Sequence, residues 1–273
     1  MSRCAFGRST KIGQKSCFKL AELECMVQAW NALEPKSKIE LDMREQDADA
    51  LWDELYDKLK NRDERRWLEN TAFMDQVEAT CPQLANTIKY LALRPFFFGS
   101  MDDLWLAQKD INHCLVQLLY CFRKCVSPTL QYLGAQPVDY FIRHPEHVKI
   151  PFDEDWGIVL NTATQQEGGE HWVALFHARD TFTLEYFDSN GELPSPRVHK
   201  ILTTLKSKNK YLKTVRLSEK EHQEDEYNCG VYTILFLFLR YIQVPFEKIE
   251  AEKMGFSHIT QFRDLLFDKC MKT

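Results

Sequence analysis

The sequence predicts an α+β fold, in which a mixed sheet flanked by helices follows an N-terminal helical region. Apolar residues recur at three- and four-residue spacings over the first third of the chain. Short runs rich in β-branched and aromatic residues then gather in the middle of the chain, with helical patterns on either side of them. Because these strands do not alternate with helices, a doubly wound parallel sheet is not expected.

The composition is that of an ordinary folded protein. The chain has 273 residues, of which 44% are hydrophobic and 27% charged. Its length permits one large domain or two smaller ones, and its net charge of -5 argues against a general nucleic-acid binder. No apolar run approaches the roughly 20 residues needed to span a bilayer. The N-terminus lacks the apolar core of a signal peptide, so we expect a soluble intracellular protein without membrane contact.

Residues 17–93 have a helical pattern without an intervening strand signal, and Pro82 begins a new helix within it. The stretch "RPFFFGSM" at 94–101 is a composition break. We therefore expect a helical N-terminal arm over residues 1–95 and a second domain over residues 96–273. That second domain opens with an amphipathic helix in 104–124.

The periodicity changes after Pro137, where short strand-like runs begin. Polar or glycine-containing turns separate them, and "ARDT" at 178–181 is typical of a hairpin turn. The expected strands are 138–142, 156–161, 171–178, 181–188 and 211–218. The expected helices are 196–207, 229–243 and 258–271.

Cys229 lies where the acidic, polar run "EHQEDEYN" meets the apolar run "VYTILFLFLRY". This places the thiol in the first turn of a buried helix, where unpaired N–H groups and the helix dipole stabilise a thiolate. Gly230 allows close backbone approach beside it. The pattern is typical of a nucleophilic cysteine that is exposed at the tip of an anchored helix.

The other cysteines do not suggest a metal site. The chain has nine cysteines in all, an odd number, and without a secretion signal most are expected to be free thiols that pack as small hydrophobes. No CxxC pair occurs, and His144 and His147 have no partner cysteine at a ligand spacing. We expect neither a metal nor a cofactor.

A base for Cys229, and an acceptor that orients this base, are expected on two neighbouring strands. His171 begins one expected strand, and Asp188 ends the next. Strands joined by a tight hairpin run antiparallel, so both residues are expected at the same sheet edge. Gln223, six residues before Cys229, could donate a hydrogen bond to an oxyanion together with the Cys229 N–H. Taken singly, His171 could be an ordinary strand-edge residue and Asp188 a turn former.

The order His-Trp, Asp, Gln-x5-Cys-Gly over residues 171–230 resembles the Ulp1/SENP and adenovirus-protease group of cysteine peptidases. "WLAQKDIN" at 105–112 is similar to the Trp-Leu-x4-Ile-Asn opening of that group's catalytic domain. "IVLNTATQQEGGEHWVALF" resembles, more closely, the polyprotein-processing proteases of large DNA viruses. The resemblance covers residues 96–273 and implies a papain-like cysteine protease core with His171, Asp188, Cys229 and Gln223 as its catalytic set.

The resemblance also implies a substrate. In this group a Gly-Gly-type segment passes between aromatic walls, for which Trp105 and Trp172 are the candidates, with Gly230 beside them. Core packing is the alternative for both tryptophans. The implied function is cleavage of viral structural precursors, such as core or capsid proteins, after Gly-Gly-Xaa sites during particle maturation. It would act in the host cytoplasm and the virion, with the nucleus as another location.

Other functions remain open on the sequence. One is a deSUMOylase-like peptidase that acts on ubiquitin-like proteins, and another is an acyltransferase with the same catalytic set. A third is a partner-binding arm beside an inactive protease domain, although all the catalytic residue types are present. The basic run at 206–213 could contact nucleic acid, but a solvated helix end is the simpler interpretation.

Overall fold

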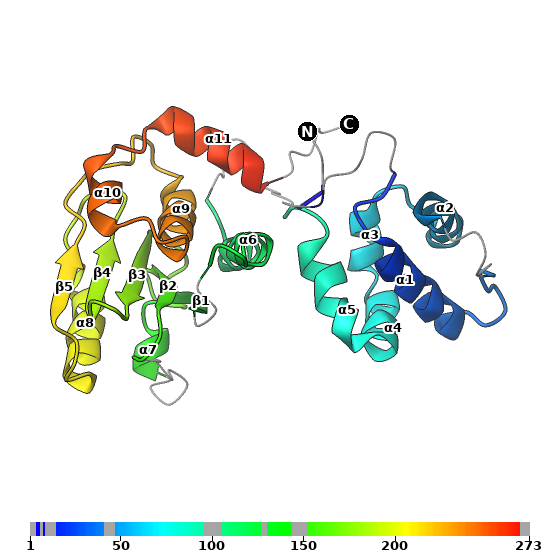
Figure 1. Ribbon diagram of the computed structural model, residues 1–273, viewed down its shortest axis with the longest axis horizontal. Coiled ribbons are helices and arrows are strands. Elements are labelled where there is room, and N and C mark those ends of the chain that lie inside the picture. The colour runs from blue at the N-terminus through cyan, green and yellow to red at the C-terminus, as the bar shows by residue number, and fades with distance from the viewer. Residues whose placement is uncertain are drawn as a thin grey trace. The chain divides into compact units, whose positions relative to one another are not determined.

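The computed structural model describes residues 4–5, 8, 15–40, 47–95, 105–126, 130–143 and 152–267. The chain divides into two compact units, Met1–Pro95 and Phe96–Thr273. The first is helical and the second contains the sheet (Figure 1). Among the described residues, no helix has the length and the apolar character needed to cross a membrane.

The first unit buries one face of each of its main helices around a shared aromatic core. Phe18 stacks on Trp67, which also contacts Trp52. Polar side chains at N-caps start three of the helices, since Asp47, Asp63 and Asn70 each accept a backbone N–H of the first turn. The elements are α1 (Leu20–Leu33), α2 (Ala48–Leu59), α3 (Glu64–Glu69), α4 (Thr71–Thr80), α5 (Pro82–Asn86) and the π-helix η1 (Thr87–Leu91).

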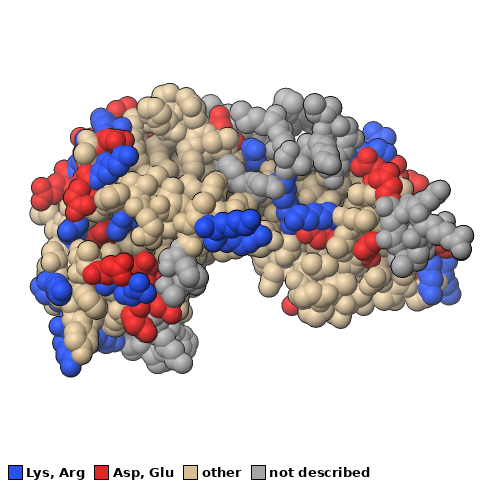
Figure 2. All heavy atoms as spheres, in the orientation of Figure 1, with Lys and Arg blue, Asp and Glu red and all other residues tan. Residues whose placement is uncertain are grey.

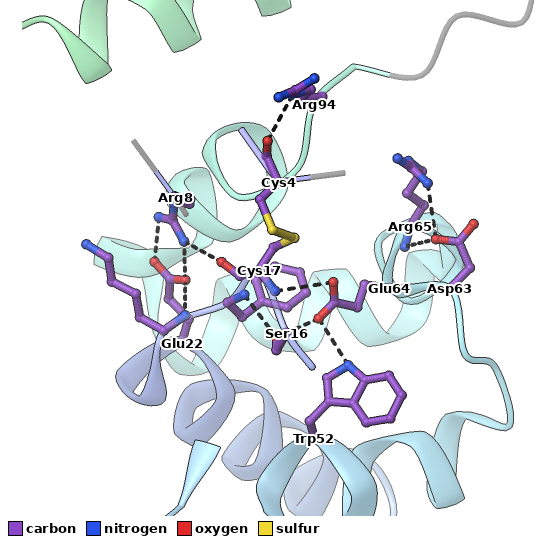
Figure 3. Close-up of a disulfide and its surroundings, with 12 residues drawn as sticks. Cys4, Arg8, Ser16, Cys17, Glu22, Trp52, Asp63, Glu64, Arg65 and Arg94 are labelled. Atoms are coloured by element: carbon purple, nitrogen blue, oxygen red, sulfur yellow. Dashed lines mark hydrogen bonds and ion pairs between the residues drawn. A yellow bond between two sulfur atoms is a disulfide. The ribbon is translucent and has the colours of Figure 1, made fainter. Parts of the chain in front are cut away.

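A disulfide and two buried carboxylates attach the N-terminal segment to these helices (Figure 3). Cys4 and Cys17 form the disulfide. Arg8 forms a two-pronged ion pair with Glu22, at 2.6 and 2.8 Å. Glu64, fully buried, accepts hydrogen bonds from the Ser16 hydroxyl and the Trp52 indole N–H. The expectation that most cysteines are thiols therefore holds for the other described cysteines, but Cys4 and Cys17 are paired.

The second unit is built on a mixed sheet, so the α+β prediction is confirmed. The described strands lie in the order β1-β2-β3-β4-β5, with parallel pairs at both ends and antiparallel pairs in the centre. The strands are β1 (Gln131–Pro137), β2 (Trp156–Asn161), β3 (Trp172–Ala178), β4 (Thr183–Phe187) and β5 (Thr214–Leu217). The helices are α6 (Gln108–Cys121), α7 (Tyr140–Arg143), α8 (Pro196–Lys208), α9 (Cys229–Tyr241), α10 (Phe246–Ala251) and α11 (Phe256–Leu266).

Alternating side chains of the central strands bury both faces of the sheet. On one face Val173, Leu175 and Leu184 pack with apolar residues of α8. On the other face α9 lies against β3, and Phe187 of β4 stacks on Phe236 of α9 with ring centroids 4.5 Å apart. α9 also packs against α6 and α11, so it is buried on several sides, which explains why it is apolar almost all round.

One predicted strand is wrong. Residues 138–142 do not form a strand, since α7 begins at Tyr140, and the strand that pairs with β2 is Gln131–Pro137. A register shift between Tyr132 and Ala135, with Gly134 at a φ of +90°, interrupts the alternation that would have marked this strand. The other strands and helices lie at the expected places with ends shifted by a few residues, and the end of the 258–271 helix beyond 267 lies outside the described residues.

Candidate active site

The hairpin of β3 and β4 brings His171 and Asp188 to one edge of the sheet. Ala174 is paired with Phe187 in the antiparallel register, so the residue just before β3 lies beside the residue just after β4. The His171 Nε2 and the Asp188 Oδ1 are 2.8 Å apart, within hydrogen-bonding distance. The expected proximity of the imidazole and the carboxylate is therefore present in the structure.

Further hydrogen bonds fix the Asp188 carboxylate, which is only 3% exposed. Its Oδ1 also accepts the Asn190 N–H at 2.8 Å, and its Oδ2 accepts the Tyr186 hydroxyl at 3.1 Å. Tyr186 lies two residues earlier on β4, so its side chain points to the same face of the sheet. Burial raises the pKa of Tyr186, as does the neighbouring carboxylate, which keeps the phenol a donor.

Cys229 is the first residue of α9, as predicted. The turn before it is held by Asp225, whose carboxylate accepts the N–H groups of Tyr227 and Asn228. Arg263 of α11 donates to the Asn228 side-chain oxygen at 2.8 Å. The expected exposure of the thiol is wrong, because Cys229 is 1% exposed. The start of α9 is covered, since Gly230 lies directly beneath Leu106.

The imidazole connects the carboxylate and the thiol. Cys229 interacts with His171 and, like Asp188, contributes to the raised pKa of the imidazole. Because Nε2 is engaged with Asp188, Nδ1 is the ring nitrogen that is left for Cys229. Burial acts to lower the pKa of His171, but the interactions with Asp188 and Cys229 outweigh it and raise the pKa to about 10. The arrangement can therefore hold an imidazolium beside a thiolate.

Gln223 is buried on the loop that leads into α9 and forms hydrogen bonds at both ends of its amide. The Ser189 hydroxyl donates to its Oε1 at 2.7 Å, and its Nε2 donates to the Asp225 carbonyl at 2.5 Å. The second N–H of the amide is the group that could donate to an oxyanion. Its role in the reaction stays a prediction.

Two clefts flank Trp105, which is 40% exposed and lines both of them. The first, of about 890 Å³, contains His171 and is called here the acidic cleft, because seven of the described residues that line it carry carboxylates. Arg197 also lines this cleft, but it is paired with Glu167. The carboxylates are those of Glu170, Asp188, Glu192, Glu221, Glu224, Asp225 and Glu226.

The second cleft, of about 900 Å³ and called here the neutral cleft, has no charged side chain among the described residues that line it. Trp172 contributes to its wall although only 6% of the residue is exposed, and the indole N–H donates to the Leu106 carbonyl at 2.9 Å. Gly230 is buried against Leu106 and Ile111 and lines neither cleft. A Cβ at Gly230 would lie 3.1 Å from Leu106, so this residue permits the close packing of α9.

Some features predicted from the sequence stay outside this site. The visible face of the second unit carries acidic and basic side chains interspersed (Figure 2). In the basic run at 206–213, Lys210 and Lys213 lie over the rings of Tyr211 and Phe182, and nucleic-acid contact there stays a prediction. His144 and His147 lie outside the described residues, and the described part of the chain contains no group of three His, Cys, Asp or Glu side chains suited to a metal.

Sequence reasoning missed two residues of the site, Tyr186 and Ser189. Tyr186 could have been found, because a residue two positions before Asp188 on the same strand must share its face. Ser189 gives no comparable local signal, since its partner Gln223 is 34 residues away in the sequence.

Comparison with known proteins finds the chain similar to viral thiol proteases. No family model matches it. It is 24% identical to a putative thiol protease of Acanthamoeba polyphaga mimivirus over 280 residues, covering 92% of this chain and 89% of that protein. A cysteine protease of African swine fever virus is 28% identical over 118 residues, covering 41% of this chain and 43% of that protein.

The fold agrees with these sequence matches. A crystal structure of the African swine fever virus protease superposes with a TM-score of 0.55 at 17% sequence identity, covering 98% of this chain and 96% of that one. The chain is thus a homologue of viral thiol proteases and shares their α+β fold. The resemblance recognised in the sequence is confirmed.

Proposed function

We propose that the protein is a cysteine endopeptidase whose catalytic domain is the unit Phe96–Thr273. The observation that carries the proposal is the chain of contacts from Asp188 through His171 to Cys229. A cysteine nucleophile needs a base that can take its proton and an acceptor that orients the base. The homology to viral thiol proteases supports this assignment of roles.

The proposed reaction begins with the Cys229 proton on His171, because the raised pKa of His171 favours the imidazolium. The thiolate attacks the substrate carbonyl, and the oxyanion accepts hydrogen bonds from the Gln223 amide and the Cys229 N–H. His171 then gives its proton to the leaving amine, and a thioester remains on Cys229. Water hydrolyses the thioester with His171 as the base, which restores the thiol.

The proposed substrate has small residues, of the Gly-Gly type, before the scissile bond. The burial of Cys229 supports this choice, since a backbone without bulky side chains approaches a covered thiol most readily. The position of Trp105 between two clefts supports an extended segment that passes along this tryptophan. We propose that the natural substrates are structural precursors of a virus, cleaved in the host cell or the virion.

A second candidate is a peptidase of ubiquitin-like proteins, because one African swine fever virus relative bears the name SUMO-1 cysteine protease. The two candidates differ in what the substrate must contain. A precursor-processing endopeptidase needs only the residues around the scissile bond, whereas a modifier peptidase also needs the folded body of the modifier.

The test is a substrate panel assayed with the wild type and with Cys229→Ala. It contains Gly-Gly-Xaa peptides, folded ubiquitin-like precursors and an acetyl-coenzyme A transfer assay. Cleavage of the peptides by the wild type alone supports the proposal, and cleavage of the folded precursors alone favours the second candidate. Peptide cleavage retained by Cys229→Ala would refute the mechanism. Acetyl transfer without any hydrolysis would refute the peptidase assignment.

A further inference from the structure

Ser189 lies between Asp188 and the loop that carries Gln223, called here the oxyanion loop, and it is fully buried. It directly follows Asp188 in the sequence. Its hydroxyl donates to the Gln223 Oε1 at 2.7 Å. Its carbonyl accepts the N–H groups of His222 and Gln223, each at 2.8 Å. One residue thus holds both the backbone and the side chain of the oxyanion loop.

The Asp225 carbonyl, which can only accept, determines which end of the Gln223 amide faces it, and the Ser189 hydroxyl holds the other end by donating to Oε1. The amide has one acceptor end and one donor end, and these differ only in the hydrogen bonds that they can make. With Oε1 taking the Ser189 hydrogen, Nε2 lies on the side of the Asp225 carbonyl and donates to it at 2.5 Å. A rotation of the amide by half a turn would set two carbonyl oxygens against each other there. The second N–H of Nε2 therefore keeps a fixed direction.

The segment around Ser189 is itself held close to the loop that carries Gln223. Gly191, at a φ of +70°, approaches the backbone so closely that a Cβ would lie 2.8 Å from the Glu221 nitrogen. The Ser218 hydroxyl donates to the Asp188 carbonyl at 3.3 Å. Both contacts join the segment that contains Ser189 to the segment that leads to Gln223. A change at Ser189 should therefore alter the position of the Gln223 side chain.

We propose that Ser189 is a positioning residue that orients the Gln223 amide for the oxyanion, an inference that rests on the proposed function. Its hydroxyl does not touch the reacting atoms but acts through Gln223. Removing it should lower kcat about tenfold, the effect of one hydrogen bond, while KM stays the same. Removing the amide itself should cost more, about a hundredfold or above.

A double-mutant cycle tests this with peptide hydrolysis by Ser189→Ala, Gln223→Ala and the double variant. The effect of Ser189→Ala should vanish in the Gln223→Ala background, because the amide that it orients is gone. Tyr186→Phe is the matched control, since it deletes another buried hydroxyl that contacts Asp188 and does not reach Gln223. Its effect should persist in both backgrounds. An equal loss from Ser189→Ala in both backgrounds, or a change in KM alone, overturns the proposal.

Two further measurements keep the result decisive. Ser189→Cys fills the same space with a much weaker donor, so it should reproduce the loss in kcat if Ser189→Ala does not fold. The ¹⁵N–¹H signals of the Gln223 side chain report its orientation without any substrate. They should be sharp in the wild type and in Tyr186→Phe but broadened in Ser189→Ala. Unchanged signals refute the inference even for a protein that cleaves none of the peptides, whereas a failed substrate panel alone counts against the proposed function.

Discussion

Replacing Asp188 by Asn should lower the pKa of His171 and thereby shift the upper pH limit of activity. Asn preserves the shape of the side chain, and its oxygen can still accept the hydrogen bonds of His171 and the Asn190 N–H. What is lost is the negative charge beside the ring. Tyr186→Phe is the control, because it removes one hydrogen bond to Asp188 and leaves the charge in place.

The size of the effect follows from the contacts. The pKa of His171 lies at about 10, against an ordinary value of 6.5, although burial acts to lower it. A hydrogen bond to a charged group contributes about 1.5–3 kcal/mol, and one pKa unit corresponds to about 1.4 kcal/mol. Loss of the charge should thus lower the pKa of His171 by one to two units, to about 8–9.

The sign for stability follows from the same pKa. Because the pKa of His171 is higher in the folded protein than in the unfolded chain, protonation of His171 stabilises the fold in full below about pH 6.5. This contribution is lost as the pH rises through the folded-state pKa of about 10. In Asp188→Asn the loss should be complete at a lower pH.

Two measurements check the shift. The NMR signal of the His171 ring, identified by its absence in His171→Gln, gives the pKa directly. The basic limb of the pH profile of kcat/KM gives the point at which His171 can no longer protonate the leaving amine. In Asp188→Asn both should move down together, and in Tyr186→Phe neither should fall. A His171 pKa that is unchanged in Asp188→Asn would refute the role assigned to the carboxylate.

Three further predictions concern the fold and the substrate. Gly157→Ala should lower the free energy of unfolding in urea by about 1–3 kcal/mol, because a Cβ at this position would collide with the Tyr241 hydroxyl. An unchanged unfolding midpoint would contradict this packing. Dithiothreitol should destabilise the protein by about 3 kcal/mol, because it reduces the Cys4–Cys17 disulfide. The variant with both cysteines changed to Ser should show no such loss of stability. An equal loss in the variant would show that the effect does not come from this disulfide. Of two Gly-Gly-Xaa peptides that differ only by Lys or Glu beside the glycines, the Lys peptide should have the higher kcat/KM at low salt, because carboxylates surround His171. The ratio should shrink as salt is added, and a ratio of one at all salt concentrations would exclude steering by the acidic cleft.

The sequence predicted those parts of the site that depend on local patterns. The proximity of His171 and Asp188 could be predicted from the sequence, because a hairpin determines which strand ends meet and side chains alternate between the two faces of a strand. Cys229 could be placed because a polar run stops where an apolar helix starts. The burial of Cys229 could not be predicted, since the start of α9 is covered by residues distant in the sequence, such as Leu106, which packs over Gly230.

Two other features were hidden for related reasons. Strand β1 was missed because Gly134 and a register shift interrupt its alternation, and its place in the sheet is set by β2 instead. The Cys4–Cys17 bond was missed because a spacing of 13 residues does not by itself identify partners among nine cysteines. In each case the feature depends on a contact between two segments that come close to each other only in the folded protein.

Two separate elements of the second unit supply the groups that would stabilise the two opposite charges of the proposed mechanism. The sheet edge supplies Asp188, which favours the imidazolium of His171. The N-terminus of α9 places Cys229 at the positive end of the helix dipole, where a negative charge is stabilised. The carboxylates of the acidic cleft also favour the imidazolium but oppose the thiolate, so they cannot replace the helix. Asp188→Asn should therefore weaken the imidazolium directly and affect Cys229 only through the positive charge lost beside it, while the contribution of α9 stays in place.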